Sequence, residues 1–412
     1  MAQRKTSFVS LLTTCLCIVV LLLLGHGSIM PSSMAEPQSK SCEAEFQRLQ
    51  PLEPIPEKLR SEAGTVEFFD EASRQLLCVG AFVFRAEIDR EGLAVPRYTD
   101  DAGLAYAQKG TGIVGFTFPG CPEAYYRFKQ GDAIALPPGV PFWFYNDNDT
   151  PLELIFVFDG NNGADELERK LKEFVLGGSN RDNSSSKGML GRVGGQNILS
   201  AFRTELLGES IGLDGRLTRS LQGQNTRAIN IVRVQGGGLN LGQVSPVDNG
   251  STMCRRKLTM NLEHPENNGP NSPRRITSLT GRNFPILNSL QLSVERGSLN
   301  QSAVLSPSYV AKAQSVVYMI RGGARLQVVD NRGVAVLDGE LRQGQLLVIP
   351  EYFVILAKAG KDGAEYITFK TDANPVIRQI AGPGSVLRGL PVTMKSPGER
   401  WHCHVYYSVV AK

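Results

Sequence analysis

Short runs of apolar residues, many of them β-branched or aromatic, recur along the first part of the chain. Four examples are residues 66–69, 78–84, 112–118 and 154–158, and Gly, Pro or Asn-Asp turns separate them. Because β-branched and aromatic side chains fit a pleated, half-buried surface, these runs predict β-strands. Many short strands with turns between them predict an all-β barrel or sandwich over residues 65–160.

The apolar spacing changes after these strands. In residues 164–175 the apolar side chains recur at helical spacing, and Gly177 stands where a helix C-cap would. Residues 198–207 and 217–221 repeat the helical spacing, and the second of them stops at Gly223. Each predicted helix has one apolar face that needs a cover, and a partner subunit could supply it.

The strand pattern returns in the second half of the chain. It restarts at Leu287 and continues in four further runs, residues 315–320, 324–329, 345–349 and 365–369. Helical spacing follows again between Val376 and Leu390. Two polar segments, residues 178–195 and 264–275, predict loops.

The two halves of the chain look like copies of each other. Residues 131–137 and 344–350 both begin with Gly and end with Pro, and Gly110 lines up with Gly322. The offsets are 213 and 212 residues, so two independent anchors agree on almost one value. The repeat predicts a mainly β fold in which a barrel followed by helices occurs twice.

One stretch between the halves combines the features of a protease-accessible joint. Residues 245–254 contain Asn249 and Gly250 and end at Cys254, and a run of glycines, residues 236–238, lies upstream. An exposed, Gly-rich, non-periodic segment is where a protease can cut. Asn-Gly also favours a tight turn, so a plain turn is the alternative interpretation.

Composition adds a contrast between the halves. The 412 residues, 42% hydrophobic and 20% charged, suffice for two globular domains. Residues 36–249 carry 22 basic and 29 acidic side chains, and residues 250–412 carry 20 and 11. Halves with charges of −7 and +9 attract each other, although chance can also produce such an asymmetry. The chain has no basic block that suits nucleic acid.

The N-terminus has the layout of a secretory signal peptide. Two basic residues precede an apolar run, residues 8–24, and small residues lead to Ala35. We assign residues 1–35 to the signal peptide, with a cut nearer Gly27 as the alternative. An uncleaved membrane anchor is the other interpretation, because the run approaches spanning length.

Secretion makes the cysteines informative. In an oxidising compartment four of the five cysteines after residue 35 can pair and one is left over, and spacing alone does not choose among the pairings. These five are Cys42, Cys78, Cys121, Cys254 and Cys403.

The repeated Gly-x5-Pro barrel module in a secreted chain resembles the cupin superfamily and its two-barrel members, the bicupins. Longer stretches are similar to the legumin-type (11S) seed storage globulins, namely residues 112–123, 221–225, 231–234, 287–293 and 337–341, together with the Asn-Gly ahead of Cys254. The resemblance covers nearly all of residues 40–395. It implies two tandem cupin (jelly-roll) β-barrels, each followed by a short helical extension.

The resemblance also implies a covalent plan. Cys42 would bond to Cys78 within the first half, and Cys121 to Cys254 across the joint. A cut after Asn249 by an asparaginyl endopeptidase would then leave an acidic and a basic chain joined by the second of these disulfides. The resemblance implies trimers before the cut, hexamers after it, and transport through the endoplasmic reticulum to the protein storage vacuole.

The implied function is a seed reserve of nitrogen and amino acids. Two features depart from the family pattern. Residues 251–253 read Ser-Thr-Met where acidic residues commonly follow the Asn-Gly, and the long Glu- and Gln-rich insert ahead of the joint is absent.

Enzymatic cupins hold a metal ion with several histidines, and the barrels of this chain lack them. After residue 35 the chain has only His264, His402 and His404. The positions where the two barrels would place metal-binding histidines fall in residues 96–100 and 308–312, which contain none. We therefore expect no enzyme and no cofactor, because Ser-His and Cys-His nucleophiles fail for the same reason.

His402, Cys403 and His404 form one unusual cluster. It could bind a metal weakly or offer a thiol for intermolecular bonding. Three ligands so close in sequence rarely converge on one ion without a fourth. A C-terminal strand or tail is the expected outcome.

A non-storage alternative uses the barrel interior. If Phe116, Phe118 and Trp143 line it, a bicupin could bind a small apolar molecule there, although the same aromatics would equally serve as core. Separately, four sites match the N-glycosylation pattern, and a glycan on the third would block the cut. They are Asn148, Asn183, Asn249 and Asn300.

Overall fold

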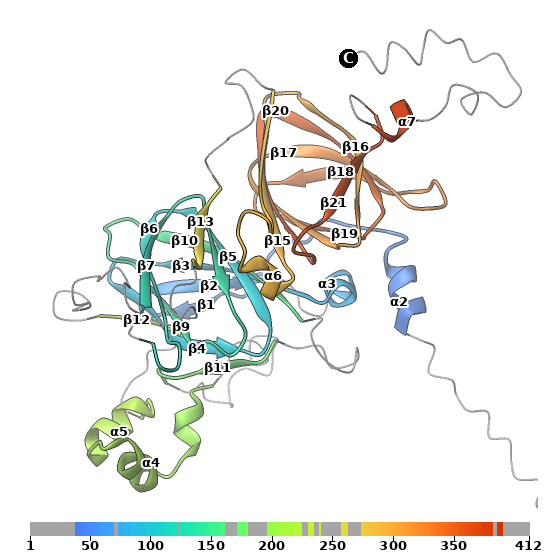
Figure 1. The fold of residues 1–412 in the computed structure, drawn as a ribbon. Coiled ribbons are helices and arrows are strands. Elements are labelled where there is room, and N and C mark those ends of the chain that lie inside the picture. Colours follow the sequence, from blue (N-terminus) through green and yellow to red (C-terminus); the bar gives the residue numbers. More distant parts are fainter. Residues whose placement is uncertain are drawn as a thin grey trace, which may run out of the picture. The chain divides into compact units, whose positions relative to one another are not determined.

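The computed structural model describes residues 38–69, 73–121, 124–160, 171–179, 196–224, 230–234, 239, 257–262, 273–381 and 385–389. The chain divides into two compact units, residues 1–43 and 44–412. The first unit is described only from the start of α2 (Gln38–Glu45). The strands of the described residues lie in the second unit, where two β-barrels follow one another along the chain as the repeat predicts (Figure 1).

The first barrel consists of two antiparallel sheets. In spatial order, one sheet holds β1 (Leu59–Ser61), β2 (Gly64–Phe68), β3 (Ala81–Ile88), β10 (Leu152–Asp159), β5 (Ala102–Lys109), β8 (Asp132–Leu136) and β13 (Thr259–Asn261). The other holds β11 (Glu173–Val175), β4 (Gly92–Thr99), β9 (Phe142–Tyr145), β6 (Thr111–Phe116) and β7 (Ala124–Lys129), with β12 (Ile231–Arg233) also paired to β4. The strands predicted from the apolar runs are therefore confirmed, except that the run from Cys78 becomes a strand only at Ala81.

The second barrel is a single sheet that folds back on itself. Its strands are β14 (Arg274–Leu279), β15 (Ser293–Leu299), β16 (Val304–Ala311), β17 (Ser315–Val329), β18 (Ala335–Arg342), β19 (Leu346–Ile349), β20 (Val354–Lys370) and β21 (Val376–Gln379). The long strands β17 and β20 pair with each other along most of their length. The two runs predicted as separate strands within residues 315–329 are one strand, because irregular pairing around Gly322 bends it without breaking it.

Short helices complete the fold. They are α3 (Arg74–Val79), the 3-10 helix η2 (Ile198–Ala201), α4 (Thr204–Ile211), α5 (Gly215–Leu221), α6 (Leu287–Leu290) and α7 (Val386–Gly389). Of the three helical stretches predicted after the first barrel, residues 217–221 are confirmed as part of α5, whereas residues 198–207 divide into η2 and the start of α4, because Phe202 and Arg203 are extended. The Asp214 carboxylate caps α5 by accepting hydrogen bonds from two backbone N–H groups, and Gly223 follows at a φ of 74°.

Four predictions of local structure were wrong. Residues 173–175 form β11 and not a helix, and Leu176 donates to the Pro96 carbonyl, so Gly177 caps nothing. Residues 376–379 likewise form β21. In both places pairing at the edge of a sheet satisfies the backbone and overrides the helical spacing.

The other two errors concern where strands begin. Cys78 lies in α3, and Gly80, with a φ of 64°, ends that helix before β3 starts. Leu287 begins a helical turn, whereas the strands of the second barrel already start at Arg274, inside a predicted loop. The rest of that loop, most of the predicted loop over residues 178–195, and residues 164–170 lie outside the described residues.

The repeat is confirmed at the level of hydrogen bonds. Gly131 and Gly344 have φ angles of 86° and 84°, which favour glycine. The Gly131 N–H donates to the Ala107 carbonyl at 2.9 Å, and the Gly344 N–H donates to the Met319 carbonyl at 2.9 Å. The same turn therefore occurs in both barrels.

The described residues form two hydrophobic clusters, of which one lies mainly in the second barrel and the larger extends through both barrels. The larger cluster includes Phe69 of the first barrel and Tyr318 of the second, whose rings meet edge to face with centroids 6.3 Å apart. Arg85 donates to the Tyr318 hydroxyl at 3.2 Å. Tyr318 is almost fully buried, and this desolvation raises its pKa.

Candidate functional site

The predicted joint lies outside the described residues, which end before residue 240 and resume at Lys257. Asn249, Gly250 and Cys254 fall in this interval. On either side of it, β12 pairs with β4 and β13 pairs with β8. Both flanking strands therefore belong to the first barrel.

The chain after the joint inserts into the first barrel. We call residues 257–262 the joint arm. Its Asn261 amide donates to the Asp132 carboxylate at 2.7 Å, and Leu258 accepts from the Ala135 N–H at 2.7 Å. Leu258 and Leu262 are 0% and 1% exposed. The first described residues of the predicted basic half thus complete a sheet of the acidic half.

The start of the acidic half makes the reciprocal contact. We call residues 46–53 the N-terminal arm. Leu52 donates to the Leu346 carbonyl at 2.7 Å and accepts from the Leu346 N–H at 2.9 Å, and Leu49 donates to the Val336 carbonyl at 2.9 Å. Leu346 occupies the repeat position of Ala133, which the joint arm contacts. The joint arm therefore pairs with β8 of the first barrel, and the N-terminal arm bonds to β19, the equivalent strand of the second barrel.

Three of the predicted cysteines are in disulfides. Cys42, Cys78 and Cys121 are each disulfide-bonded. Their pairing stays a prediction, since the proposed partner of Cys121 lies outside the described residues. The cluster His402, Cys403 and His404 also lies outside the described residues.

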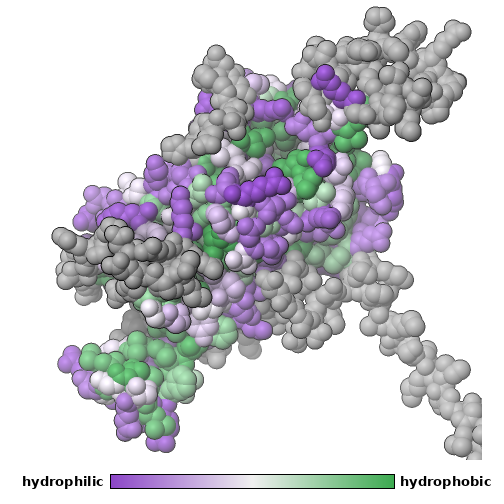
Figure 2. All heavy atoms as spheres, viewed as in Figure 1, coloured by the Kyte–Doolittle hydropathy of each residue, from purple (hydrophilic) through white to green (hydrophobic). Residues whose placement is uncertain are grey.

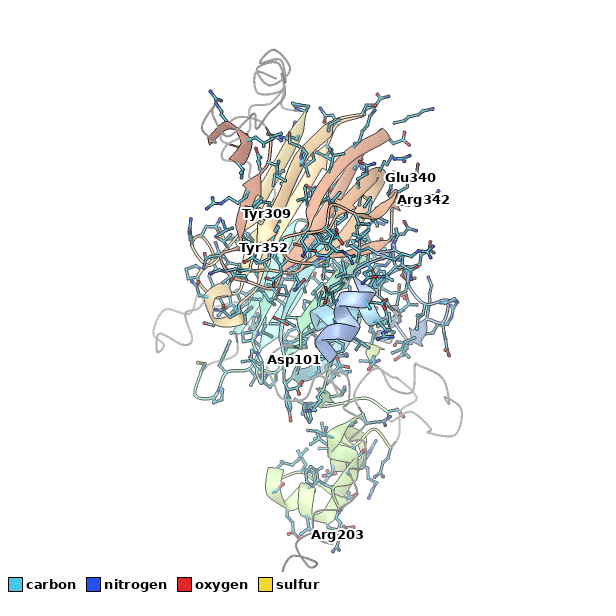
Figure 3. The ribbon with its side chains drawn as sticks, turned by 90° about the vertical axis from the view of Figure 1, so that its right-hand side faces the viewer. Asp101, Arg203, Tyr309, Glu340, Arg342 and Tyr352 are labelled. Atoms are coloured by element: carbon cyan, nitrogen blue, oxygen red, sulfur yellow. The ribbon has the colours of Figure 1, made fainter. Side chains whose placement is uncertain are left out.

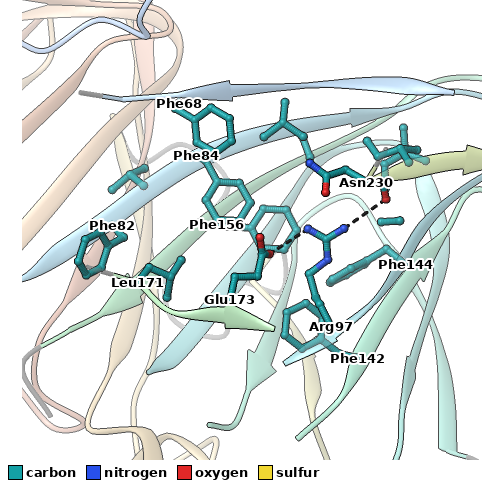
Figure 4. Close-up of a pocket in the computed structure, with 16 residues that line it drawn as sticks. Phe68, Phe82, Phe84, Arg97, Phe142, Phe144, Phe156, Leu171, Glu173 and Asn230 are labelled. Carbon is teal, nitrogen blue, oxygen red and sulfur yellow. Dashed lines mark hydrogen bonds and ion pairs between the residues drawn. The ribbon is translucent and has the colours of Figure 1, made fainter. Parts of the chain in front are cut away.

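An ion pair stands inside the first barrel (Figure 4). Arg97 on β4 donates to the Glu173 carboxylate on β11 at 2.9 Å, and the two side chains are 12% and 10% exposed. Arg97 also donates to the carbonyls of Val95 at 3.1 Å and Asn230 at 3.2 Å. The unfilled space beside it is about 50 Å³, room for a few water molecules.

Arg97 lies in the segment where a metal-binding histidine was sought. A guanidinium has no lone pair to offer a metal, and three of its five N–H donors are taken by Glu173 and two carbonyls. The charged groups of this interior therefore bond to each other and to backbone carbonyls, which leaves no ligand set for a metal ion among its described residues. Sequence reasoning missed Glu173 because its segment was predicted to be helical.

The aromatic side chains that line this cavity are not the predicted ones. Phe116 and Phe118 are buried and pack on each other with ring centroids 6.2 Å apart, outside the cavity lining. Phe142 and Phe144 line it, while Trp143 between them is half-buried. Successive side chains of a strand point to opposite faces, which sets Trp143 apart from its neighbours.

The second barrel contains a different ion pair. The Lys370 ammonium donates to the Glu295 carboxylate at 3.0 Å, and the side chains are 4% and 11% exposed. The Ser278 hydroxyl donates to the same carboxylate at 3.3 Å. The adjoining cavity of about 90 Å³ is larger than that of the first barrel. Nothing in the sequence pointed to this pair, whose members are 75 residues apart.

The described part of the chain contains neither a metal-binding cluster nor a membrane-spanning helix. There, no three His, Cys, Asp or Glu side chains gather as a metal site would require. No helix there has the length and apolar character needed to cross a membrane. All four histidines of the chain lie outside the described ranges.

Two of the glycosylation candidates can be placed. Asn300 is exposed at the end of β15. The Asn148 amide donates to the Thr111 carbonyl at 3.1 Å and is partly covered. Asn183 and Asn249 are not described, so use of these sites stays a prediction.

Comparison with known proteins identifies the fold family. The family model described as Cupin matches residues 49–180 and 260–396. Glutelin type-B 4 of Oryza sativa subsp. japonica is 40% identical over 409 residues, covering 85% of this chain and 81% of the glutelin. The two tandem cupin (jelly-roll) barrels expected from the sequence are therefore confirmed.

Solved structures agree. Pumpkin seed globulin has a TM-score of 0.80 with 31% identity, covering 89% of this chain and 96% of the globulin. Procruciferin, an 11S globulin from Brassica napus, has a TM-score of 0.80 with 35% identity, covering 89% and 95%. On these grounds, the chain belongs to the cupin superfamily and, within it, to the legumin-type (11S) seed storage globulins.

Proposed function

We propose that the protein is a nutrient reservoir that stores nitrogen and amino acids for the seed and catalyses no reaction. The observation that carries this proposal is 40% identity to a rice glutelin over most of the chain. The satisfied ion pair inside the first barrel supports it, since that interior offers no free base or nucleophile among the described residues. Storage requires a stable, compact fold and no active site.

We propose that the precursor is cut after Asn249 by an asparaginyl endopeptidase. The products are an acidic chain, residues 36–249, and a basic chain, residues 250–412, tethered by a bond from Cys121 to Cys254. A second bond, from Cys42 to Cys78, closes a loop and stabilises the fold by roughly 3–4 kcal/mol in the chain-entropy model. The disulfide-bonded states of Cys42, Cys78 and Cys121 support both pairings.

We propose that copies of the chain assemble into trimers, and into hexamers after the cut. Exposed apolar side chains gather over α4 and α5 (Figure 2), including Leu206 at 58% and Leu217 at 52%. A second set of exposed apolar side chains lies on β21 and α7, where Ile377 is 43% and Val386 is 42% exposed. Two different sets of exposed apolar side chains on one chain suit head-to-tail contacts, which close into rings.

The location follows from the same scheme. Residues 1–35 act as the signal peptide, and the chain passes through the endoplasmic reticulum to the protein storage vacuole. We expect no contact with a membrane after the signal peptide is removed. Disulfide formation in the described part of the chain agrees with an oxidising compartment.

Mass spectrometry of protein purified from seed tests this function. Without reduction we expect one species of the combined mass, and after reduction and denaturation two chains that meet between Asn249 and Gly250. The protein should also be abundant in seed. A single undivided chain after reduction would contradict the processing scheme, and scarcity in seed would contradict the storage role.

A further inference from the structure

Two rows of side chains cross the interior of the second barrel. Across the three strands β15, β20 and β17, Ser293 stands opposite Lys370, which stands opposite Ser315. In the next row, Glu295 stands opposite Thr368. Side chains opposite each other in an antiparallel sheet project from the same face, so this end of the interior is polar.

The same rows of the first barrel are filled with aromatic rings. Across β3, β10 and β5, Phe82 stands opposite Phe158 and Phe158 opposite Gly103, followed by Phe84 opposite Phe156. Phe84 stacks on Phe156 with ring centroids 4.7 Å apart. Phe158 occupies the space that a Cβ on Gly103 would need. At these rows the second barrel is therefore polar where the first is aromatic, although the first barrel has its own ion pair, Arg97 with Glu173, elsewhere in its interior.

Two hydroxyl groups in the polar rows have no hydrogen-bond partner among the described residues. They belong to Ser293 and Ser315, which are 2% and 3% exposed. Ser315 lines the cavity, as Lys370 does, and Lys370 has three N–H donors of which Glu295 takes one. Buried polar groups without a partner call for water or a ligand.

The ion pair restricts what such a ligand can be. Lys370 and Glu295 neutralise each other, so a charged ligand would leave a buried charge uncompensated. The rest of the cavity wall is largely apolar and includes Met319, Leu326 and Phe353. The cavity of about 90 Å³ exceeds the ~10–15 Å³ that one water molecule requires.

We propose that the second barrel binds a small uncharged molecule with an apolar body and one hydroxyl or carbonyl group. The polar group of the ligand contacts the Ser315 hydroxyl and the free donors of Lys370, and its body packs against Met319, Leu326 and Phe353. The ligand site considered from the sequence was the aromatic interior of the first barrel, whereas this site lies in the second barrel. It does not depend on a storage role.

Calorimetric titration of the assembled protein tests this site with two probes of similar size, phenol and benzoate. We expect saturable binding of one phenol per chain and binding of benzoate weaker by about tenfold or more. Ser315→Val should weaken phenol binding by about tenfold, because it removes the hydroxyl that contacts the ligand and puts two apolar methyl groups in its place. Ser298→Val, on the outward face of β15, is the matched control and should leave binding unchanged.

A crystal soaked in phenol supplies a readout that does not depend on the variants. The phenol oxygen should lie within hydrogen-bonding distance of Ser315 Oγ or Lys370 Nζ. Ordered water alone in this cavity, or equal binding of phenol by the Ser315→Val and Ser298→Val proteins, would overturn the proposal. Tighter binding of benzoate than of phenol would overturn the choice of an uncharged ligand.

Discussion

The two barrels have the same backbone fold, but different side chains fill their interiors. At equivalent positions the first has the stacked rings of Phe84 and Phe156, and the second has Glu295 and Thr368. The turns that need glycine are kept in both, whereas the interior rows have diverged. A duplicated fold therefore retains what the backbone requires and leaves the interior free to change.

The largest effect is expected from breaking the ion pair of the second barrel. Lys370→Met leaves the Glu295 carboxylate buried without its cation, which should cost about 3–5 kcal/mol of unfolding free energy. The double variant Lys370→Met, Glu295→Gln removes both charges and should recover most of the loss. Chemical denaturation measures both, and equal losses for the single and double variants would contradict a paired interior.

The second largest loss of unfolding free energy is expected when the aromatic stack of the first barrel is truncated. Phe156 is 5% exposed, and Phe156→Ala should cost about 3 kcal/mol through lost contacts and the cavity left behind. Thr368→Ala at the equivalent position is the matched control and should cost less than about 1 kcal/mol, since it borders a cavity already present. Similar losses at the two positions would show that the interiors do not differ in packing.

A smaller effect depends on pH and belongs to the first barrel. Burial raises the pKa of Asp101 to about 6, and the carboxylates of Asp100 and Asp159 add to the shift. The equivalent residue of the second barrel is Ala313. Asp101 is labelled in Figure 3.

The sign of the pH effect follows from this raised pKa. Between about pH 4 and 6 the folded protein binds a proton at Asp101 that the unfolded chain does not, so stability falls as pH rises through this window. Partial contact with solvent reduces the effect to about 1–2 kcal/mol. Thermal unfolding of Asp101→Asn should show a weaker pH dependence than the parent, and an unchanged profile would contradict the shift.

The smallest effect should come from Ser315→Ala. Its hydroxyl is buried without a partner among the described residues, so its removal should raise stability slightly, by up to about 1 kcal/mol. Denaturation in the absence of any added small molecule measures this. A loss of more than about 1 kcal/mol would indicate a hydroxyl already well satisfied.

Local patterns in the sequence predicted much of the fold. The repeated turn needs glycine at Gly131 and Gly344, and β-branched runs fit strands, so both signals are carried by neighbouring residues. The pattern failed for β11 and β21, where pairing with a distant strand decides the conformation. Helical spacing cannot detect such pairing.

The interior sites were harder to predict for the same reason. Glu295 and Lys370 lie on separate strands and meet only when β15 and β20 pair. In the sequence each resembles an ordinary surface charge. The missing histidines, in contrast, could be read directly from composition.

The reciprocal arms bear on how the halves stay together. The joint arm adds a strand to the first barrel, and the N-terminal arm bonds to Leu346 of the second. Leu258 and Leu49 are buried in these contacts, at 0% and 3% exposed. The two halves should therefore remain assembled without a covalent link.

Native mass spectrometry of the cut protein after mild reduction tests this interlocked design most directly. We expect the acidic and basic chains to stay in one particle under native conditions and to separate only when denatured. Release of free acidic or basic chains on reduction alone would contradict it, because the disulfide would then be the only link between the halves.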